Sequence, residues 1–422
     1  MDSAPSLPYT HRFQIGAFRC QVHDGGGSRP DLNSPTGFAF SAIGLESAAR
    51  LGYMARHDEV ATGRSTGESN RALLTRCIGG MGNCLNGVVS GLVLSLLTDR
   101  AFFVEWNYPV SSCGINWDFG SAAASVRAAL NAAPRQEFVD DCFVATELTR
   151  WLERCTISEL QAHWPQPHIK IDTNCPLYKH LAMNPNLAPN LQALGLLRKP
   201  SFPLELKQSN AAVAMTPNDP YHPYSPGFLA YGAALRSFFG IAPDLYAEVI
   251  KLIDAIPRGA LLIGIQIRLG GAVNGKPNDP VFLPDGMIED VLRCAQTLGG
   301  LLQLSYQHSA KTMTGAPLAF FLASDSERVT ESARKRFGSR LVVSAGVPMH
   351  GHAGQGLPKA LIDEWMLVLS DALVVTPGST FGATAAMLNG RLPYYVSWGD
   401  KKCRVTDMAA PPPRYQTIFP AF

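Results

Sequence analysis

The stretch from residue 359 to residue 390 constrains the fold most, because it predicts a helix, a strand, a turn and a second helix in direct succession. Four apolar residues recur at helical spacing in its first part: Leu361, Trp365, Val368 and Leu369. They give this segment the single apolar face of a helix that packs on a sheet. The run from Ala372 to Val375 is short and wholly apolar, which predicts a buried strand of a parallel sheet.

The turn after this strand is the first candidate for a binding site. Gly378 permits a sharp reversal. Ser379 or Thr380 can cap the helix expected from Phe381 to Leu388, and Gly390 suits the end of that helix. In α/β folds, ligands bind where the carboxyl ends of strands meet the amino ends of helices. The amides and the dipole at such a helix start favour an anion.

The composition is ordinary for a globular protein. The chain has 422 residues, enough for two domains with sizeable cores, and 46% of them are apolar while 17% are charged. A net charge of +2 gives no reason to expect nucleic acid or an anionic membrane as the main partner. The longest apolar stretch, Leu85 to Leu97, has about 13 residues and falls short of the roughly 20 that a transmembrane span needs.

Two features bear on the cellular compartment. The N-terminal segment lacks the basic and apolar regions of a signal peptide, so we expect a cytosolic protein or one whose anchor is not included in this sequence. Nine cysteines are present, and no C-x-x-C occurs, so we do not expect a zinc site. The cysteines either form N-terminal disulfides in an oxidising compartment or remain free, half-buried thiols.

The first strong structural unit along the chain is a strand, a glycine-rich turn, a helix and a second strand. The strands are expected at 72–77 and 101–105, with the helix at 85–97. The turn between them holds Gly80, Gly82 and Asn83, whose backbone can approach a phosphate at the helix start. The alternative is a tight turn without a ligand. The pattern is not a dinucleotide fingerprint, because its third glycine is missing.

Domain boundaries follow from changes in pattern. We interpret 1–70 as an irregular N-terminal arm, 71–240 as a first α/β domain, 241–400 as a second, and 401–422 as an extended tail. Strands alternate with helices in the second domain, which predicts an α/β fold with a parallel, doubly wound sheet. Further helices are expected at 121–132, 145–162 and 227–239, and a proline-rich loop at 215–227.

Polar residues end three strands of the second domain. Gln266 and Arg268 lie on one face of a strand, and Arg268 sits at its end, where a guanidinium can grip a phosphate. Ser324 and Asp325 end the next strand; Asp325 either accepts from a base or ribose hydroxyl or caps a helix, and Ser324 with Glu327 forms a capping-box pattern. The third strand end is the turn described above, with four candidate donors: Ser379, Thr380, Phe381 and Gly382.

Other motifs narrow the chemistry. His350 and His352 have no carboxylate or cysteine at ligand spacing, so we interpret them as loop histidines, with His350 near a bound ligand, rather than as a metal site. D-x-D, Walker A and G-x-S-x-G motifs are absent, which disfavours kinases, NTPases, esterases and many metal-dependent sugar transferases.

Four blocks occur in the order GMGN, IGIQIR, FLASDSERV and KALIDEWMLVLSDALVVTPGSTFGATAAML. In this order they resemble the motifs of the fucosyltransferase superfamily, most closely the plant cell-wall, xyloglucan-type enzymes. The resemblance covers roughly residues 72–105 and 260–396. The segment between these two ranges, which belongs largely to the first domain, has no match to the family.

The resemblance implies a fold of GT-B type, with two Rossmann-like domains facing across a cleft. It implies an inverting, metal-independent transfer of fucose from GDP-fucose to a glycan hydroxyl, with a galactosyl residue as the expected acceptor and the Golgi lumen as the expected location. Arg268 would then grip the diphosphate, Asp325 would contact guanosine, and Gly82 and Asn83 would close over the diphosphate. The strand-end turn would bind phosphate through its hydroxyls and amides. No metal or other cofactor is expected.

This sequence departs from the family pattern in three places. It shows no N-terminal Golgi anchor, it has Cys84 where an arginine often follows G-x-G-N, and Pro377 and Gly378 precede S-T-F-G. The alternatives are a transferase that uses another nucleotide sugar or a protein Ser/Thr acceptor, and an inactive protein that binds a glycan or a nucleotide. The general base and the oligomeric state are not predicted.

Overall fold

The computed structural model describes residues 47–67, 70–106, 120, 122–138, 147–197, 226–238, 241, 243–273, 276–310, 316–346, 356–390, 393–397, 399 and 401–405. These residues divide into two compact units. We call residues 47–238 the N-terminal unit and residues 241–405 the C-terminal unit, and each is described by itself.

The N-terminal unit is built on a four-stranded sheet with strand order β2-β1-β4-β3. All its strand pairs are parallel. The strands are β1 (Ala72–Arg76), β2 (Ala101–Glu105), β3 (Arg135–Phe138) and β4 (His168–Thr173). The helices are α2 (Ser47–Ala61), α3 (Met81–Leu97), α4 (Ala124–Ala132), α5 (Glu147–Leu152), α6 (Ile157–His163), α7 (Leu177–Met183), α8 (Ala188–Ala193) and α9 (Pro226–Phe238).

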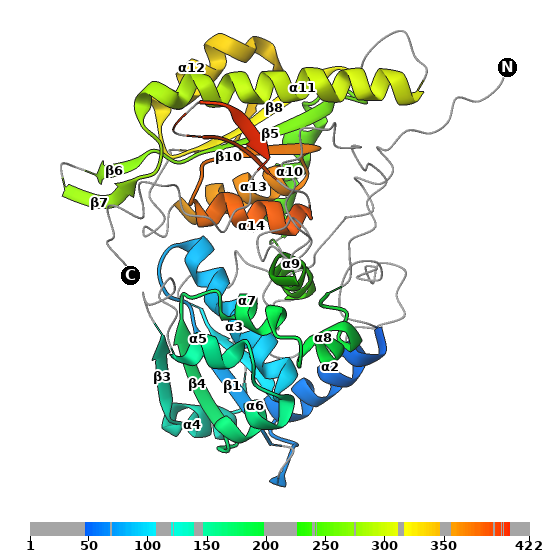
Figure 1. The fold of residues 1–422 in the computed structure, drawn as a ribbon, viewed down its shortest axis with the longest axis vertical. Helices are drawn as coiled ribbons and strands as arrows, with labels where there is room; N and C mark the ends of the chain where they lie inside the picture. The colour runs from blue at the N-terminus through cyan, green and yellow to red at the C-terminus, as the bar shows by residue number, and fades with distance from the viewer. Residues whose placement is uncertain are drawn as a thin grey trace, which may run out of the picture. The chain divides into compact units, whose positions relative to one another are not determined.

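Helix α3 is the central helix of this unit (Figure 1) and packs closely against the sheet. A Cβ atom on Gly87 would lie 1.8 Å from the carbonyl oxygen of Thr173, and one on Gly91 would lie 2.1 Å from Oγ1 of Thr75. Both glycines therefore allow a close approach of helix and strand. Helix α3 also contacts α7 and α9, so the predicted apolar run is buried on nearly every side rather than along one stripe.

Helix α2 corrects the prediction that residues 1–70 form an irregular arm. It has little amphipathic periodicity, so its sequence gave no helix signal. Contacts with the rest of the unit hold it instead: Tyr53 hydrogen-bonds to Ser95, and Nε2 of His57 lies 2.9 Å from the carbonyl oxygen of Phe102 in β2. Tertiary contacts thus hold a helix that lacks an amphipathic pattern.

The C-terminal unit is built on a six-stranded sheet with strand order β12-β11-β10-β5-β8-β9. Strands β5 (Leu261–Ile267), β8 (Leu318–Ser324), β9 (Leu341–Val343), β10 (Ala372–Val375) and β11 (Tyr394–Val396) are parallel, while the edge strand β12 (Cys403–Val405) is antiparallel. A separate antiparallel hairpin consists of β6 (Gly270–Val273) and β7 (Lys276–Val281).

Helices cover both faces of this sheet (Figure 1). Alternate residues of β5, Ile263, Ile265 and Ile267, pack into one hydrophobic core with α11 (Ile288–Ala310) and α12 (Glu327–Phe337). Helices α10 (Pro243–Asp254), α13 (Leu357–Val368) and α14 (Thr380–Asn389) belong to the other side (Figure 1). Two short 3₁₀ helices, η4 (Asp285–Met287) and η5 (Gly338–Arg340), complete the described part of the unit.

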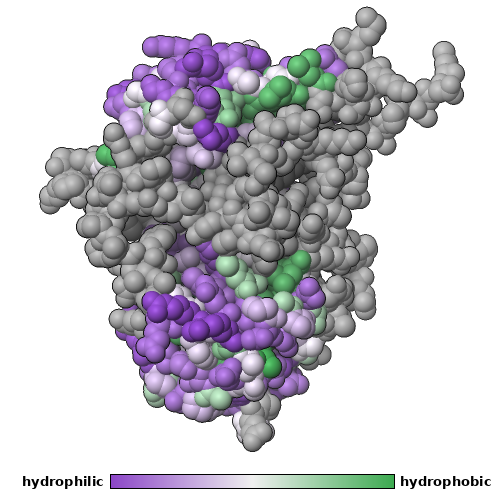
Figure 2. Space-filling model, in the orientation of Figure 1, coloured by the Kyte–Doolittle hydropathy of each residue, from purple (hydrophilic) through white to green (hydrophobic). Residues whose placement is uncertain are grey.

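The outer surface of α12 is hydrophilic, as its charged sequence predicts (Figure 2). An apolar spot lies on the later part of α11, where Leu301 and Leu304 are 58% and 63% exposed. An apolar spot formed by two leucines is small for a protein surface and needs no partner to explain it. Among the described residues, no helix is both long and apolar enough to cross a membrane.

The predicted α/β class with parallel sheets is confirmed. The predicted helix, strand, turn and helix at 359–390 correspond to α13, β10 and α14, and Gly390, in the left-handed conformation, ends the last helix.

Other details differ from the predictions. One helix expected at 145–162 is two, because α5 and α6 are separated by the Thr156 cap. Strand β12 lies in the segment expected to be an extended tail. Strands β3 and β4 and the β6–β7 hairpin were not predicted. Residues 215–225 and 406–422 lie outside the described residues.

Disulfides resolve the open question about the cysteines in part. Cys77 pairs with Cys84, and Cys294 on α11 pairs with Cys403 on β12. Cys155 is a free, buried thiol. Some cysteines therefore form disulfides, as one interpretation expected, and Cys155 remains a free thiol, as the other expected. The Cys294–Cys403 disulfide lies in the C-terminal unit, where none was expected.

The Cys294–Cys403 disulfide closes a loop of 109 residues and anchors the short edge strand β12. Since a disulfide that closes a loop of this size restricts the unfolded chain strongly, Cys403→Ser should lower the free energy of unfolding by about 2–5 kcal/mol. Thermal unfolding of the oxidised proteins measures the difference, and the variant and the parent should converge when both are fully reduced. A difference of the same size under reducing conditions would contradict this account.

Glu364 on α13 gives a second prediction for this unit. Its side chain is fully buried and has no hydrogen-bond partner among the described residues. Burial, with Asp363 beside it, raises its pKa well above the usual value. Below the pKa of Glu364 in the unfolded chain, its carboxyl group is neutral in both states. Above that pKa the unfolded chain loses the proton while the folded protein keeps it, so the free energy of unfolding declines as the pH rises toward the pKa of the folded state.

Glu364→Gln removes this titration while preserving the shape of the side chain. The melting temperature of the variant relative to the parent should therefore increase from about pH 5 to about pH 8. Glu331→Gln, at an exposed position of α12, is the matched control and should show no such trend. A constant difference between Glu364→Gln and the parent across this range would contradict a buried neutral carboxyl group.

Candidate functional site

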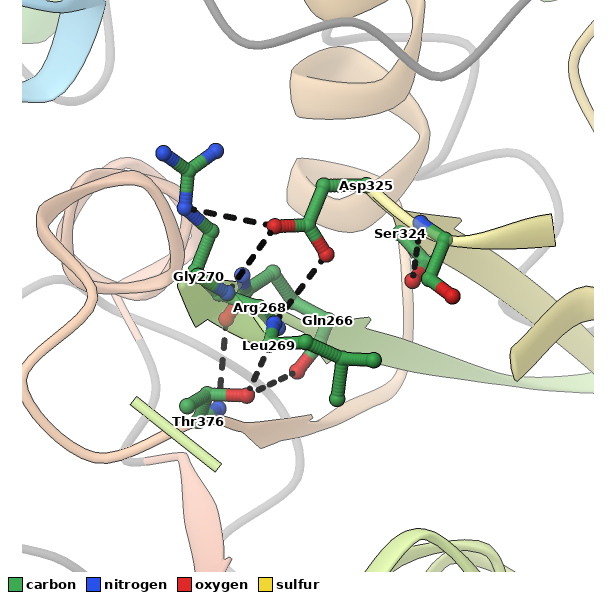
Figure 3. Close-up of polar contacts among 8 residues, drawn as sticks. Gln266, Arg268, Leu269, Gly270, Ser324, Asp325 and Thr376 are labelled. Carbon is green, nitrogen blue, oxygen red and sulfur yellow. Dashed lines mark hydrogen bonds and ion pairs between the residues drawn. The ribbon is translucent and has the colours of Figure 1, made fainter. Parts of the chain in front are cut away.

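The candidate site lies at the carboxyl edge of the C-terminal sheet. Strand β5 is central, with β10 on one side and β8 on the other, and the register places Gln266 of β5 beside Val375 of β10 and Ala323 of β8. The three strands end near this level, at Ile267, Ser324 and Val375, so the first residues after them lie close together. They are Arg268, Asp325 and Thr376, which Figure 3 shows in contact.

Asp325 accepts hydrogen bonds from the turn that follows β5. Its Oδ1 accepts from the amide of Leu269 at 3.0 Å, and its Oδ2 accepts from the amide of Gly270 at 3.3 Å. The same Oδ2 lies 3.4 Å from Nε of Arg268 (Figure 3). The carboxylate is only 7% exposed. A carboxylate bound to two amides and a guanidinium is satisfied without any ligand.

Thr376 holds the same segment from the β10 side. Its Oγ1 accepts from the amide of Arg268 at 2.9 Å and donates to the carbonyl oxygen of Gln266 at 3.2 Å. The side-chain Oε1 of Gln266 accepts from the amide of Thr376 at 3.2 Å. Gln266 is buried, and these contacts make it a link between two strands.

Arg268 is held on two sides while part of its guanidinium faces outward. Nε faces Asp325, and the guanidinium carbon lies 5.9 Å from the centre of the Phe282 ring, within reach of a cation–π interaction. The other two guanidinium nitrogens point away from Asp325 (Figure 3). The side chain is 25% exposed, so it can meet a ligand at the edge of the sheet.

The turn between β10 and α14 contains Gly378 in the left-handed region, at φ 77°. Ser379 is the N-cap residue of α14, but its hydroxyl makes no capping hydrogen bond, contrary to one use expected for it. The first amides of a helix have no partner inside the helix. Those of Thr380, Phe381 and Gly382 therefore make the start of α14 suited to an anion.

Gly382 is required by close packing rather than by its backbone angles. A Cβ atom there would lie 2.7 Å from Oε1 of Gln266 and 2.9 Å from Cβ of Val375. The start of α14 thus rests directly on β10 and on the Gln266 side chain. This contact fixes the position of the helix start relative to the strand that carries Arg268.

The expected capping box at Ser324 is wrong. The N-cap residue of α12 is Ser326, and the Ser324 hydroxyl accepts from the Ser326 amide at 3.2 Å. The reason is geometric: β8 extends through Ser324, and α12 begins only at Glu327. Ser324 remains at the same edge of the sheet as Arg268 and Asp325.

The remaining predicted site residues belong to the other unit or lie outside the described residues. Gly80, Gly82 and Asn83 belong to the N-terminal unit, where Gly80 is the N-cap residue of α3 and the Cys77–Cys84 disulfide brackets the turn. Their phosphate role stays a prediction. His350 lies outside the described residues. Within the described part of the C-terminal unit, the predicted residues at the ends of β5, β8 and β10 therefore lie at one edge of the sheet.

One polar cluster at this end of the unit was missed by sequence reasoning. The ammonium group of Lys359 lies 2.7 Å from both Ser344, which follows β9, and the carboxylate of Asp363; Ser344 also donates to Asp363. Burial raises the pKa of Asp363, while Lys359 opposes that rise. The four-residue spacing of Lys359 and Asp363 was the available signal. Across the described ranges, no group of three or more His, Cys, Asp or Glu has a metal-binding arrangement.

Gly382→Ala tests the packing at the start of α14. The added methyl group should lower the free energy of unfolding by about 1–3 kcal/mol, because it overpacks against Gln266 and Val375. Gly300→Ala is the matched control: it lies inside α11, has no atom within 4 Å of the added Cβ, and should be neutral or stabilising. Equal melting temperatures for Gly382→Ala and the parent would contradict this packing.

No family model and no curated protein matches the chain. Solved structures do. A mutant of FUT1 from Arabidopsis thaliana, in complex with GDP, shares 14% identity over 88% of this chain and 85% of that chain, with a TM-score of 0.55. Two other structures are less similar. The fucosyltransferase NodZ from Bradyrhizobium shares 16% identity over 80% of this chain and 99% of that chain, with a TM-score of 0.40. POFUT1 in complex with GDP shares 8% identity over 78% of this chain and 99% of that chain, with a TM-score of 0.35. The chain thus has the α/β fold of the plant fucosyltransferase FUT1.

Proposed function

We propose that the protein is a fucosyltransferase that moves L-fucose from GDP-fucose to a hydroxyl group of a glycan. The observation that carries this proposal is that Arg268 follows β5 and α14 follows the neighbouring strand β10, at the same carboxyl edge of a parallel sheet. A guanidinium and a helix start at one sheet edge suit the diphosphate of a nucleotide sugar. The fold shared with a fucosyltransferase makes fucose the favoured sugar.

The proposed mechanism depends on the charge that develops on the leaving group. The acceptor oxygen attacks C1 of fucose, the bond from C1 to the β-phosphate oxygen breaks, and the electron pair stays on GDP. Arg268, with the amides of Thr380 and Phe381, would stabilise that negative charge; groups of this kind contribute roughly 3–4 kcal/mol each to lowering the barrier. Attack from the face opposite the leaving group inverts the configuration at C1. The residue that takes the proton of the acceptor hydroxyl is not assigned.

The donor site proposed here also includes uncharged residues at the carboxyl edge of the C-terminal sheet. These residues are Gln266, Ser324, Ser379 and Gly382. His350 stays a predicted contact. A galactosyl acceptor and a metal-independent reaction are parts of the proposal that rest on the sequence resemblance. Neither is needed for the Arg268 prediction below.

An oxidising compartment is the proposed location. The Cys77–Cys84 and Cys294–Cys403 disulfides support it, because such bonds are rare in proteins of the cytosol. The lumen of the Golgi apparatus is the compartment that the sequence resemblance favours. The cytosolic alternative would require both pairs to be reduced in the cell.

The first test removes the proposed phosphate contact. Arg268→Ala should abolish transfer from GDP-fucose while leaving the melting temperature and the far-ultraviolet circular dichroism close to those of the parent. Arg293→Ala, which removes an exposed arginine of α11, is the matched control and should keep full activity. Turnover by Arg268→Ala near the level of the parent would contradict the assignment of the site.

The second test identifies the nucleotide. Thermal unfolding is measured with GDP, UDP, ADP and CMP, each at saturating concentration. A ligand at 100 times its dissociation constant adds about 2.7 kcal/mol of stability, enough for a clear shift in melting temperature. GDP should stabilise the protein and the other three should not. Stabilisation by UDP alone would overturn the proposed donor.

A further inference from the structure

The segment that leaves β5 has an unusual hydrogen-bond arrangement. Three consecutive backbone amides, those of Arg268, Leu269 and Gly270, each donate to a side chain from a neighbouring strand end. Thr376 takes the first from the β10 side, and Asp325 takes the other two from the β8 side. These amides are therefore engaged within the protein, and the donor that this strand end presents to a ligand is the Arg268 side chain.

Asp325 is the group that joins this backbone segment to that side chain. Its Oδ2 faces both the amide of Gly270 and Nε of Arg268, so one carboxylate oxygen sets the backbone turn and the direction of the guanidinium together. On its other side the guanidinium meets the ring of Phe282, whose own amide donates to the carbonyl oxygen of Leu269 at 2.9 Å. The base of the arginine is thus held on two sides by the segment that Asp325 fixes.

The contacts of Asp325 disfavour a direct contact with a nucleoside. Its carboxylate is 7% exposed, and both oxygens accept from backbone amides. Turning the carboxylate toward a base or a ribose would leave the amides of Leu269 and Gly270 without their acceptors, which costs free energy when such groups are buried. The guanidinium is more exposed, at 25%, and two of its nitrogens point away from Asp325 (Figure 3).

We propose that Asp325 is a positioning residue: it aims the outer nitrogens of Arg268 at the diphosphate and does not touch the nucleoside. This role rests on the proposed function, because it requires that Arg268 binds the phosphates. It replaces the expectation that Asp325 contacts guanosine. The positioning role also explains why this residue is an arginine. The Nε–H of an arginine can face Asp325 while the two outer nitrogens bind a phosphate, whereas a lysine has a single terminal ammonium group.

The test compares GDP with GMP, because the two share the nucleoside and differ in the β-phosphate. Asp325→Asn should weaken GDP binding by about tenfold, because Arg268 loses the ion pair that orients it, and leave GMP binding within about twofold of the parent. Isothermal titration calorimetry measures both dissociation constants. An equal loss for GDP and GMP would overturn the positioning role, because it would place the missing contact on the nucleoside or the α-phosphate.

A double-mutant cycle with Arg268 adds a readout that a purely structural role would not change. In the Arg268→Ala background, Asp325→Asn should have little further effect on GDP affinity, since there is no guanidinium left to aim. Full additivity of the two losses would contradict the proposal. Asp290→Asn is the matched control, because Asp290 is also ion-paired and 11% exposed, and it should leave the affinity for both nucleotides unchanged.

A second variant keeps the proposal testable if Asp325→Asn does not fold. Asp325→Glu retains the charge and both acceptor oxygens but displaces them from Nε of Arg268, so it should show the same selective loss of GDP affinity. An unchanged GDP affinity in Asp325→Glu would contradict the positioning role. Failure of the parent protein to bind GDP at all would instead overturn the proposed function, on which this role depends.

Discussion

The hydrogen bonds that fix the end of β5 are the interaction on which the candidate site depends. Strand β5 lies in the middle of its sheet, and its isoleucines are fully buried in the core with α11 and α12, so the strand cannot shift without disturbing both. At its end, Asp325 and Thr376 take the next amides from either side. The direction of Arg268 is therefore set by the same contacts that end the strand.

The start of α14 is fixed by a second constraint of the same kind. Gly382 allows the helix to lie directly on Gln266 and Val375, and Gln266 in turn bonds to Thr376. The guanidinium and the helix start thus share a set of buried contacts. Electrostatic stabilisation of a leaving group requires donors that are already in position, and a shared support of this kind supplies that rigidity.

Much of the C-terminal unit could be predicted because its central strands β5, β8 and β10 are short, mainly apolar runs that end in polar residues. The positions of Arg268, Asp325 and Ser379 at neighbouring strand ends follow from that pattern alone. The role of Asp325 could not be predicted, because it depends on which amides lie within its reach in three dimensions. Helix α2 was missed because long-range contacts such as that of Tyr53 with Ser95, rather than an amphipathic pattern, hold it in place. The short edge strand β12 gives too brief a signal, and its disulfide to α11 pairs residues 109 positions apart.

The central claim is that the carboxyl edge of the C-terminal sheet binds the diphosphate of a nucleotide sugar through Arg268 and the start of α14. A crystal structure of the protein with GDP tests it most directly. The account predicts that the outer guanidinium nitrogens of Arg268 and the first amides of α14 lie within hydrogen-bond distance of the phosphates, while Asp325 keeps its bonds to Leu269 and Gly270. Phosphates bound elsewhere, with Arg268 making no contact to them, would contradict it.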